Sequence, residues 1–154
     1  MEENNVVRGI RFKLPKKHNS SIYKILEGVD FDRYIWEIKY DNVFNSNKEF
    51  LFKNKLYNGK NFRETISFPY YHTVFVTIQA FPIGMRRSKI NDYSEFSRSN
   101  CELILLIEDE ILSYIYTKNV KILEIIKENA EKHNFLDIDF ITQQNDIISN
   151  FEIM

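Results

Sequence analysis

The spacing of apolar residues along the chain predicts a regular succession of strands and helices. From Tyr34 to Tyr40, every second side chain is large and apolar, a period of two that is typical of a half-buried strand. The same alternation runs from Val6 to Leu14, and Thr73 to Phe81 is rich in β-branched and aromatic residues. In the segment from Cys101 to Glu108, the side chains expected on both faces of a strand are apolar. This pattern predicts a central strand covered on both faces or lying at a subunit contact.

Apolar positions three and four residues apart predict helices between these strands. The side-chain oxygens of Asn19 to Ser21 favour a helix start, and Gly28 falls where that helix would end. Asn119 precedes the longest predicted helix, Val120 to His133. The other predicted elements are a loop over 41–48, a strand over 49–53, a helix over 91–97, and strands over 111–117 and 136–142. Residues 61–68 fit a short helix or a strand, and we favour the helix.

The predicted order is therefore β-α-β-β-(α)-β-α-β-β-α-β. Short strands mixed with helices and hairpins indicate an α+β fold, in which helices pack on a mixed, mainly antiparallel sheet. The length of 154 residues suits one domain, which we place at residues 1–154. A second interpretation divides the chain into two β-α-β-β-α halves, about 6–68 and 72–142, although no residue-level repeat supports it.

The composition, 44% hydrophobic and 28% charged, is that of a globular protein. The longest uninterrupted apolar run, Leu103 to Ile107, is too short to cross a bilayer, and the polar start at Met1 to Asn5 does not resemble a secretory signal. One cysteine cannot form an internal disulfide, which fits a reducing compartment. We therefore expect a cytoplasmic protein without a membrane partner.

The formal charge of −1 disfavours a nucleic-acid binder, because such proteins neutralise many phosphates with cations. The charges are nevertheless uneven: residues 1–77 carry 13 Lys and Arg against 9 Asp and Glu, and residues 78–154 carry 8 against 13. Five cations lie close together near the start: Arg8, Arg11, Lys13, Lys16 and Lys17. We interpret them as the solvated face of an edge strand, with a phosphate or acidic partner as the alternative.

The inventory of reactive residues excludes most well-known sites. Four glycines cannot build a dinucleotide- or phosphate-binding loop, and the chain has no Gly-x-Ser-x-Gly elbow. The three histidines and the single cysteine are too scattered for a structural zinc site. Cys101 opens a buried strand, so we interpret it as a packing residue rather than a nucleophile. We expect no catalytic, cofactor-binding or metal-binding residues.

Three residues remain as candidate contacts for a ligand or a partner. Arg86 and Arg87 lie in a predicted loop, and paired guanidinium groups can hold a carboxylate or a phosphate. His72 precedes a strand and could serve as a general base in a cleft. Each has a plainer interpretation as well, namely a solvated turn for the arginines and a hydrogen-bonded strand end for the histidine.

Most of the chain resembles a known family. The residues that carry the resemblance are Arg8-Gly9-Ile10, Phe12, Pro15, Tyr34, Trp36, Ala80, Pro82, Gly84, Tyr93, Glu95, Phe96, Ser99, Cys101, Ile107, Asp109, Tyr116, Lys118, Phe140-Ile141-Thr142 and Asn145-Asp146. They are similar to a small family of low-GC Gram-positive bacteria described as a domain of unknown function. The resemblance implies a bacterial cytoplasmic protein and supplies no activity. The segment from Gln143 to Met154 departs from the family's acidic, threonine- and arginine-rich ending, so any function of that ending is altered here.

Three functions are compatible with these observations. The missing catalytic constellation and the balanced charge favour a non-catalytic protein-interaction or binding module. A homodimer is also expected if the strand from Cys101 lies near a sheet edge. The alternatives are a small enzyme with a site near His72 and Arg86/Arg87, and a weak RNA-binding protein that stacks bases on Tyr34 and Trp36.

Overall fold

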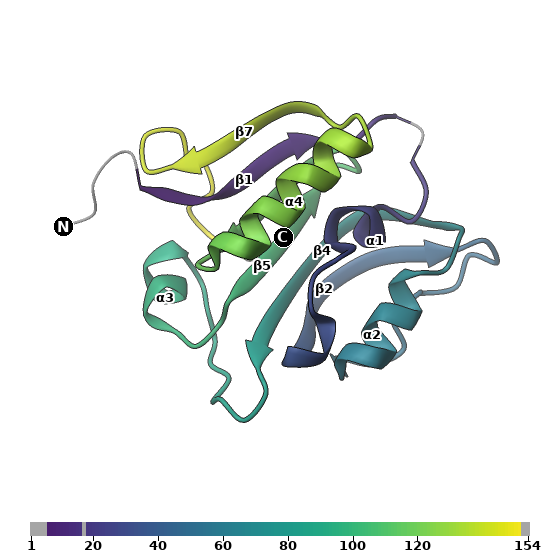
Figure 1. Cartoon of the computed structure of the whole chain (residues 1–154). Helices are drawn as coiled ribbons and strands as arrows, with labels where there is room; N and C mark the ends of the chain where they lie inside the picture. The colour runs from purple at the N-terminus through teal and green to yellow at the C-terminus, as the bar shows by residue number, and fades with distance from the viewer. Residues whose placement is uncertain (1–5, 17, 152–154) are drawn as a thin grey trace.

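The computed structural model describes residues 6–16 and 18–151, which form one antiparallel sheet of seven strands with four α-helices (Figure 1). The strands lie in the order β3-β2-β4-β5-β6-β1-β7, and each neighbouring pair is antiparallel. The strands are β1 (Val7–Lys13), β2 (Tyr34–Asn45), β3 (Leu56–Tyr57), β4 (Tyr71–Pro82), β5 (Leu103–Glu108), β6 (Leu112–Thr117) and β7 (Leu136–Thr142). The helices are α1 (Ser21–Leu26), α2 (Gly59–Ile66), α3 (Tyr93–Arg98) and α4 (Val120–Lys132), with a 3-10 turn at Phe31–Arg33.

This order confirms the predicted α+β fold, although two boundaries differ from the prediction. Strand β2 continues to Asn45 through most of the predicted loop, because its residues stay paired with β4 as far as Tyr71. Tertiary pairing here overrides the weak strand preference of the asparagines. The predicted strand over 49–53 is reduced to one bridge between Phe44 and Phe50, and β3 instead forms at Leu56–Tyr57.

Helices α1, α2 and α4 cover one face of the sheet, called here the helix face (Figure 1). Trp36 is fully buried on this face, and its ring stacks on that of Phe62 in α2 with the centroids 4.4 Å apart. The same core contains apolar side chains from strands and helices alike: Ile10, Ile38, Ile78, Leu105 and Ile115, and Ile22, Ile25, Ile66 and Ile126. The alternating stripe around Trp36 is therefore an interior packing surface.

A polar clamp joins α1 to α4 at the edge of this core. The Asn129 side-chain amide donates to the carbonyl oxygens of Ile25 and Glu27, both at 2.8 Å, and so satisfies carbonyls at the end of α1. Lys132 Nζ and His133 Nε2 lie 2.9 and 2.8 Å from Glu27 Oε1. Burial alone would raise the pKa of Glu27, but the bonds to these two partners lower it. The carboxylate is thus held in its charged form between the helices.

The opposite face of the sheet is covered in part by α3 and by residues 147–151. A second core lies there, formed by Phe81, Ile90, Phe96, Cys101, Ile104, Leu106, Tyr114, Tyr116, Ile141 and Phe151. Because β5 contributes to both cores, its doubly apolar pattern is explained, and the prediction of a central strand is confirmed. Burial raises the pKa of Cys101 to about 12, so the thiol packs as a small apolar group.

The interpretation of the basic cluster as an edge-strand face is wrong. Strand β1 lies between β6 and β7, inside the sheet. The ion pairs are Arg8–Asp146, Arg11–Asp139 and Lys13–Asp137, so cations of the first half are neutralised by acids of the second. Lys17 lies outside the described residues. Part of the uneven charge along the sequence is therefore paired across the sheet.

The edges of the sheet are β3 and β7, whereas β5 lies fourth of the seven strands. The edge position on which the dimer prediction depended is thus not found for β5. Strand β7 has a positive φ of 53° at Asp137, and the Asn145 side chain bonds to the Thr142 N–H and the Phe140 carbonyl. Such irregularities blunt an edge against pairing. The strands of the two suggested halves are interleaved in this single sheet, since β1 lies between β6 and β7.

Candidate functional site

His72 lies near the start of β4, half exposed, in a small polar cluster. Its Nε2 is 3.5 Å from a carboxylate oxygen of Glu110, and its ring stacks against that of His18 with the centroids 6.1 Å apart. His18 Nε2 lies 2.9 Å from the Glu110 carbonyl oxygen. Burial is the main cause of a lowered pKa for His18, so its imidazole favours the neutral form.

Arg86 and Arg87 lie in the exposed loop that follows β4, as predicted. Arg87 Nη1 is 3.3 Å from Glu37 Oε1, so this guanidinium already has a carboxylate partner in the fold. The Arg86 carbonyl accepts a hydrogen bond from the Asn100 side chain, while the Arg86 side chain itself has no ion pair among residues 6–16 and 18–151. Arg87 is therefore already paired with a carboxylate whereas Arg86 is not, so the two guanidinium groups are not both available to hold one anion.

The structure does not bring His72 together with these arginines. Strand β4 runs from Tyr71 to Pro82, with His72 at one end and the arginine loop beyond the other. At about 3.3 Å per residue, the strand holds them roughly 30 Å apart. A catalytic site that combines His72 with Arg86 or Arg87 has no geometric basis. The RNA-stacking alternative loses its basis too, since Tyr34 and Trp36 are 2% and 0% exposed.

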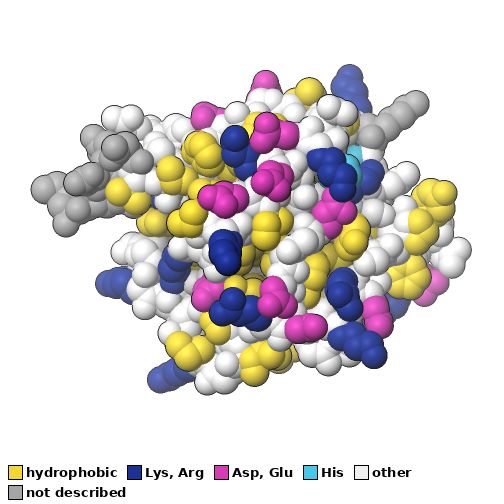
Figure 2. Space-filling model, in the orientation of Figure 1, with side chains coloured by type: hydrophobic (Ala, Val, Ile, Leu, Met, Phe, Trp, Pro, Cys, Tyr) yellow, Lys and Arg dark blue, Asp and Glu magenta, His cyan; other side chains and the backbone are white. Residues whose placement is uncertain are grey.

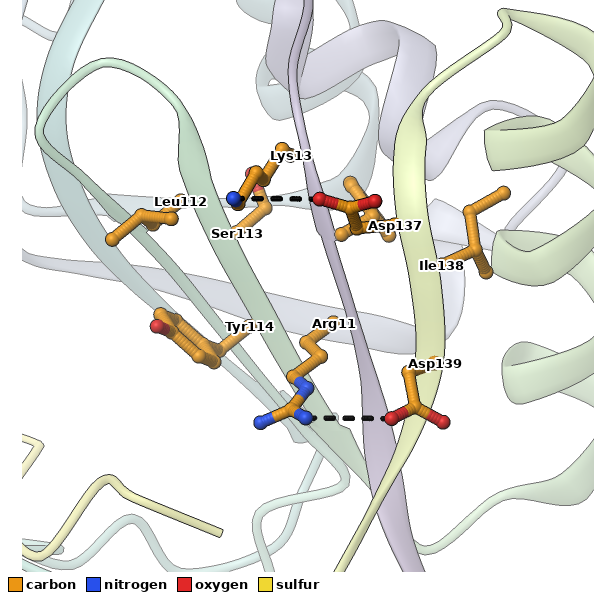
Figure 3. Close-up of a pocket in the computed structure, with 9 residues that line it drawn as sticks. Arg11, Lys13, Leu112, Ser113, Tyr114, Asp137, Ile138 and Asp139 are labelled. Carbon is orange, nitrogen blue, oxygen red and sulfur yellow. Dashed lines mark hydrogen bonds and ion pairs between the residues drawn. The ribbon is translucent and has the colours of Figure 1, made fainter. Parts of the chain in front are cut away.

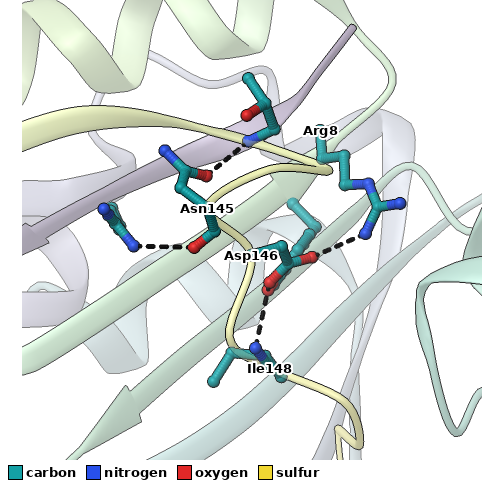
Figure 4. A network of polar contacts seen from close by, with 7 residues as sticks. Arg8, Asn145, Asp146 and Ile148 are labelled. Carbon is teal, nitrogen blue, oxygen red and sulfur yellow. Dashed lines mark hydrogen bonds and ion pairs between the residues drawn. The ribbon is translucent and has the colours of Figure 1, made fainter. Parts of the chain in front are cut away.

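A polar network that the sequence did not predict ties the end of the described chain to β1 (Figure 4). Arg8 Nη1 lies 2.9 Å from Asp146 Oδ2, while Asp146 Oδ1 accepts from the Tyr116 hydroxyl at 2.7 Å and from the Ile148 N–H at 3.1 Å. The guanidinium of Arg8 also lies 4.1 Å from the centroid of the Tyr93 ring. These residues, called here the Arg8 corner, satisfy one another and leave little for a ligand.

A hollow of about 450 Å³ opens on the opposite face between β6, β1 and β7 (Figure 3). Its wall carries two ion pairs, Arg11 with Asp139 and Lys13 with Asp137, each at 3.3 Å. Because each cation faces a carboxylate, the hollow has no excess of either charge. Burial is the main reason that the pKa of Tyr114 is raised, so its hydroxyl remains neutral.

A second hollow, of about 570 Å³, lies between the β2–β3 loop, α2 and the loop that joins α2 to β4. Its rim includes Phe68, Pro69 and Tyr70, called here the aromatic corner, with Phe68 59% and Tyr70 63% exposed. Apolar side chains gather at the corresponding edge of the surface, on the right of Figure 2. This volume lies within the range of ligand-binding pockets.

Internal hydrogen bonds hold the loop that carries the aromatic corner. The Tyr71 hydroxyl donates to the Ile66 carbonyl at 2.7 Å, and the Ser20 hydroxyl donates to the Phe68 carbonyl. The sequence predicts a helix start from the side-chain oxygens of Asn19 to Ser21, but Ser20, the N-cap residue of α1, adopts a φ of 55° and makes no side-chain cap. Its hydroxyl instead fixes the rim of the hollow.

The facing wall is fixed in the same way. Asn45 Oδ1 accepts from the N–H groups of Asn47 and Glu49 at 2.9 and 3.1 Å, which shapes the β2–β3 loop. The Tyr57 hydroxyl accepts from the N–H groups of Lys53 and Asn54 at 2.9 and 3.1 Å. Both walls are therefore largely preorganised.

Several polar side chains around this hollow remain available. The side-chain amides of Asn47, Asn54 and Asn61 make no hydrogen bond within the described part of the chain, and Glu64 has no ion pair there. The sequence carried a signal for this site, since the run Phe68-Pro69-Tyr70 has neither helical nor strand periodicity and follows an asparagine-rich segment. That signal is weak, because periodicity assigns apolar residues to a core only when they recur.

Among residues 6–16 and 18–151, no group of three or more His, Cys, Asp or Glu side chains is arranged to hold a metal ion. None of the helices in the described ranges has the length and apolar character needed to cross a membrane.

The fold and its surfaces define an α+β protein built on one antiparallel sheet, with an exposed aromatic corner beside a preorganised hollow. The chain belongs to the family described as "Protein of unknown function (DUF2691)", which matches residues 7–152. It is 34% identical over 144 residues to "Uncharacterized protein YncE" of Bacillus subtilis (strain 168), covering 90% of this chain and 94% of that protein. These matches confirm the predicted relationship to a family of low-GC Gram-positive bacteria. No solved structure matches the chain.

Proposed function

We propose that this protein is a non-catalytic interaction module that binds a partner protein through the aromatic corner. The observation that carries the proposal is the exposure of Phe68 and Tyr70, 59% and 63%, on the rim of a hollow of about 570 Å³. Aromatic side chains are enriched at protein contact surfaces, where a few of them supply most of the binding free energy.

The residues around the hollow support binding rather than catalysis. Tyrosine beside asparagine and serine is the combination found at antibody binding surfaces. There, rigid rings supply contact area and small polar groups supply adaptable hydrogen bonds. The hollow offers this combination from Ser46, Asn47, Tyr57 and Tyr70.

The bacterial cytoplasm is the proposed location. The Bacillus subtilis relative supports a bacterial setting. Cys101, the one cysteine of the chain, is buried and free, so the fold uses no disulfide that would need an oxidising compartment.

Arg86 is proposed as a second partner contact at the far end of β4. Its neighbours Ile83 and Met85 are 59% and 51% exposed, and arginine and methionine are both enriched in interfaces. Arg87 and His72 are weaker candidates, because Glu37 and Glu110 already lie beside them.

The test is quantitative affinity capture from host cell extract with matched variants. The double variant Phe68→Ser/Tyr70→Ser removes both rings of the aromatic corner. The control, Ile147→Ser, removes an apolar side chain that is 72% exposed on another part of the surface. We expect at least one protein to be retained by the wild type and by the control but lost from the double variant. The same set of proteins captured by all three would contradict the proposal.

A further inference from the structure

The unpaired polar groups around the hollow point to a specific kind of partner. A side-chain carboxamide carries both donors and an acceptor, as a peptide group does. Asn47 lies in the β2–β3 loop, Asn54 just before β3 and Asn61 in the first turn of α2, so three such groups surround one concave space. They can form hydrogen bonds with the main chain of a guest that has no secondary structure of its own.

The apolar part of the hollow fits a side chain of such a guest. Leu51 and Tyr57 line it and are only 7% exposed each, while Phe68, Pro69 and Tyr70 form its rim. A ring inserted here would contact these apolar side chains. Burying a phenylalanine-sized side chain contributes about 1.5–3 kcal/mol, or roughly 10- to 150-fold in affinity.

The charged side chains around the hollow favour a guest that carries a cation. Lys53 faces Glu49, with Nζ 3.7 Å from the carboxylate oxygen. Glu64, also on the wall of the hollow, has no ion pair within the described residues. One carboxylate is thus available to a cation of the guest. Since Glu64 is exposed and its field is screened by water, the gain in affinity should be small, about two- to fivefold.

We propose that the aromatic corner binds an extended peptide segment, with an aromatic side chain in the hollow, its main chain held by the asparagine amides, and a basic residue beside Glu64. This inference rests on the proposed function and names its mode of recognition. Both walls are fixed before the guest arrives, so binding orders the peptide more than the protein, which favours short segments.

The experiment is a titration of the full-length, ¹⁵N-labelled protein, followed through its backbone and side-chain amide resonances. The probes are three capped peptides: Ac-Ala-Lys-Phe-Lys-Ala-NH₂, its glutamine counterpart Ac-Ala-Gln-Phe-Gln-Ala-NH₂, and Ac-Ala-Lys-Ala-Lys-Ala-NH₂. We expect the first peptide to shift the side-chain amides of Asn47, Asn54 and Asn61. Replacement of its phenylalanine should weaken binding at least about tenfold, and replacement of its lysines about two- to fivefold.

Matched variants of the protein complete the test. Glu64→Gln should remove the difference between the lysine and glutamine peptides and leave the phenylalanine preference intact. Asn61→Ala should weaken all phenylalanine peptides, with unfolding curves confirming that the variant folds. Absence of any shift with the three peptides would overturn the inference. So would stronger shifts of the same amides with a neutral disaccharide such as cellobiose.

The peptide inference and the proposed function can fail independently of each other. If Phe68→Ser/Tyr70→Ser loses a captured protein while the peptides do not bind, the corner contacts a folded surface, and only the peptide inference fails. If capture is unchanged but the peptides bind as expected, the hollow recognises peptides, and the wider role in partner capture fails.

Discussion

The Arg8 corner and the hollow beside the aromatic corner both combine aromatic and polar side chains, but in opposite states. At the Arg8 corner, the side chain of Asp146 is 3% exposed and bonded to Arg8 and Tyr116. At the aromatic corner, Phe68 and Tyr70 are more than half exposed, and the nearby asparagine amides have no partner in the described chain. Charged and aromatic residues that are satisfied inside the fold stabilise it, whereas those left unsatisfied at a preformed hollow are available to a ligand. The two corners should therefore respond differently to substitution.

The largest effect is expected at Gly9, in the strand that carries Arg8. A Cβ atom there would clash with the backbone carbonyl of Ile115 and crowd Tyr116, neither of which is a flexible side chain. Gly9→Ala should destabilise the fold by about 4 kcal/mol or more, measured by urea unfolding with the fluorescence of buried Trp36. Gly84→Ala is the control, because nothing lies within 4 Å of its Cβ position and only its φ of 85° opposes the change, at about 1 kcal/mol. Equal losses in the two variants would contradict this account.

A smaller but clear loss is expected from breaking the ion pair of the Arg8 corner. Asp146→Ala removes the carboxylate that bonds both the mostly buried Arg8 guanidinium and the Tyr116 hydroxyl, so we expect a loss of about 3 kcal/mol. Asp139→Ala breaks an exposed pair with Arg11 and should cost less than about 1 kcal/mol. Similar unfolding free energies for the two variants would mean that burial does not distinguish the pairs.

Lowering the pH should destabilise the fold near the aromatic corner, where Ser20 links the His18 segment to Phe68. The pKa of His18 is lowered, mainly by burial, with His72 and Lys24 acting in the same direction and Glu110 opposing them. The unfolded chain therefore binds more protons just below pH 6.5, and stability falls as the pH drops through this range towards the folded-state pKa. Unfolding midpoints at pH 7.5 and 5.5 should differ more for the wild type than for His18→Gln. Equal differences would show that His18 does not contribute.

Most of the fold could be predicted from the sequence, because it depends on side chains that alternate or recur. The alternating apolar residues around Trp36 and the strand through Leu105 that is apolar on both faces predict burial directly from their patterns. The helix at Val120–Lys132 likewise follows from its apolar period and from Asn119, whose side chain caps it as expected. These features are local, so one sequence contains them.

The pairings that define the two corners could not be predicted, because they join distant positions. Simple alternation places Arg8 on the same face of its strand as Ile10 and Phe12, but the ladder with β7 shifts register between Val7 and Gly9, and Arg8 pairs with Asp146 instead. Such a bulge redirects a side chain without a signal of its own in the sequence. The hollow beside Tyr70 likewise requires three segments to meet, and no spacing within any one of them shows this.

The most direct test of the central claim is the unfolding free energy of Phe68→Ser/Tyr70→Ser. If these rings are kept for a partner, their removal should change the stability of the isolated protein by less than about 0.5 kcal/mol, the range of ordinary surface substitutions. A loss of about 2 kcal/mol or more would show that Phe68 and Tyr70 pack within the fold, and would contradict their assignment as a binding surface.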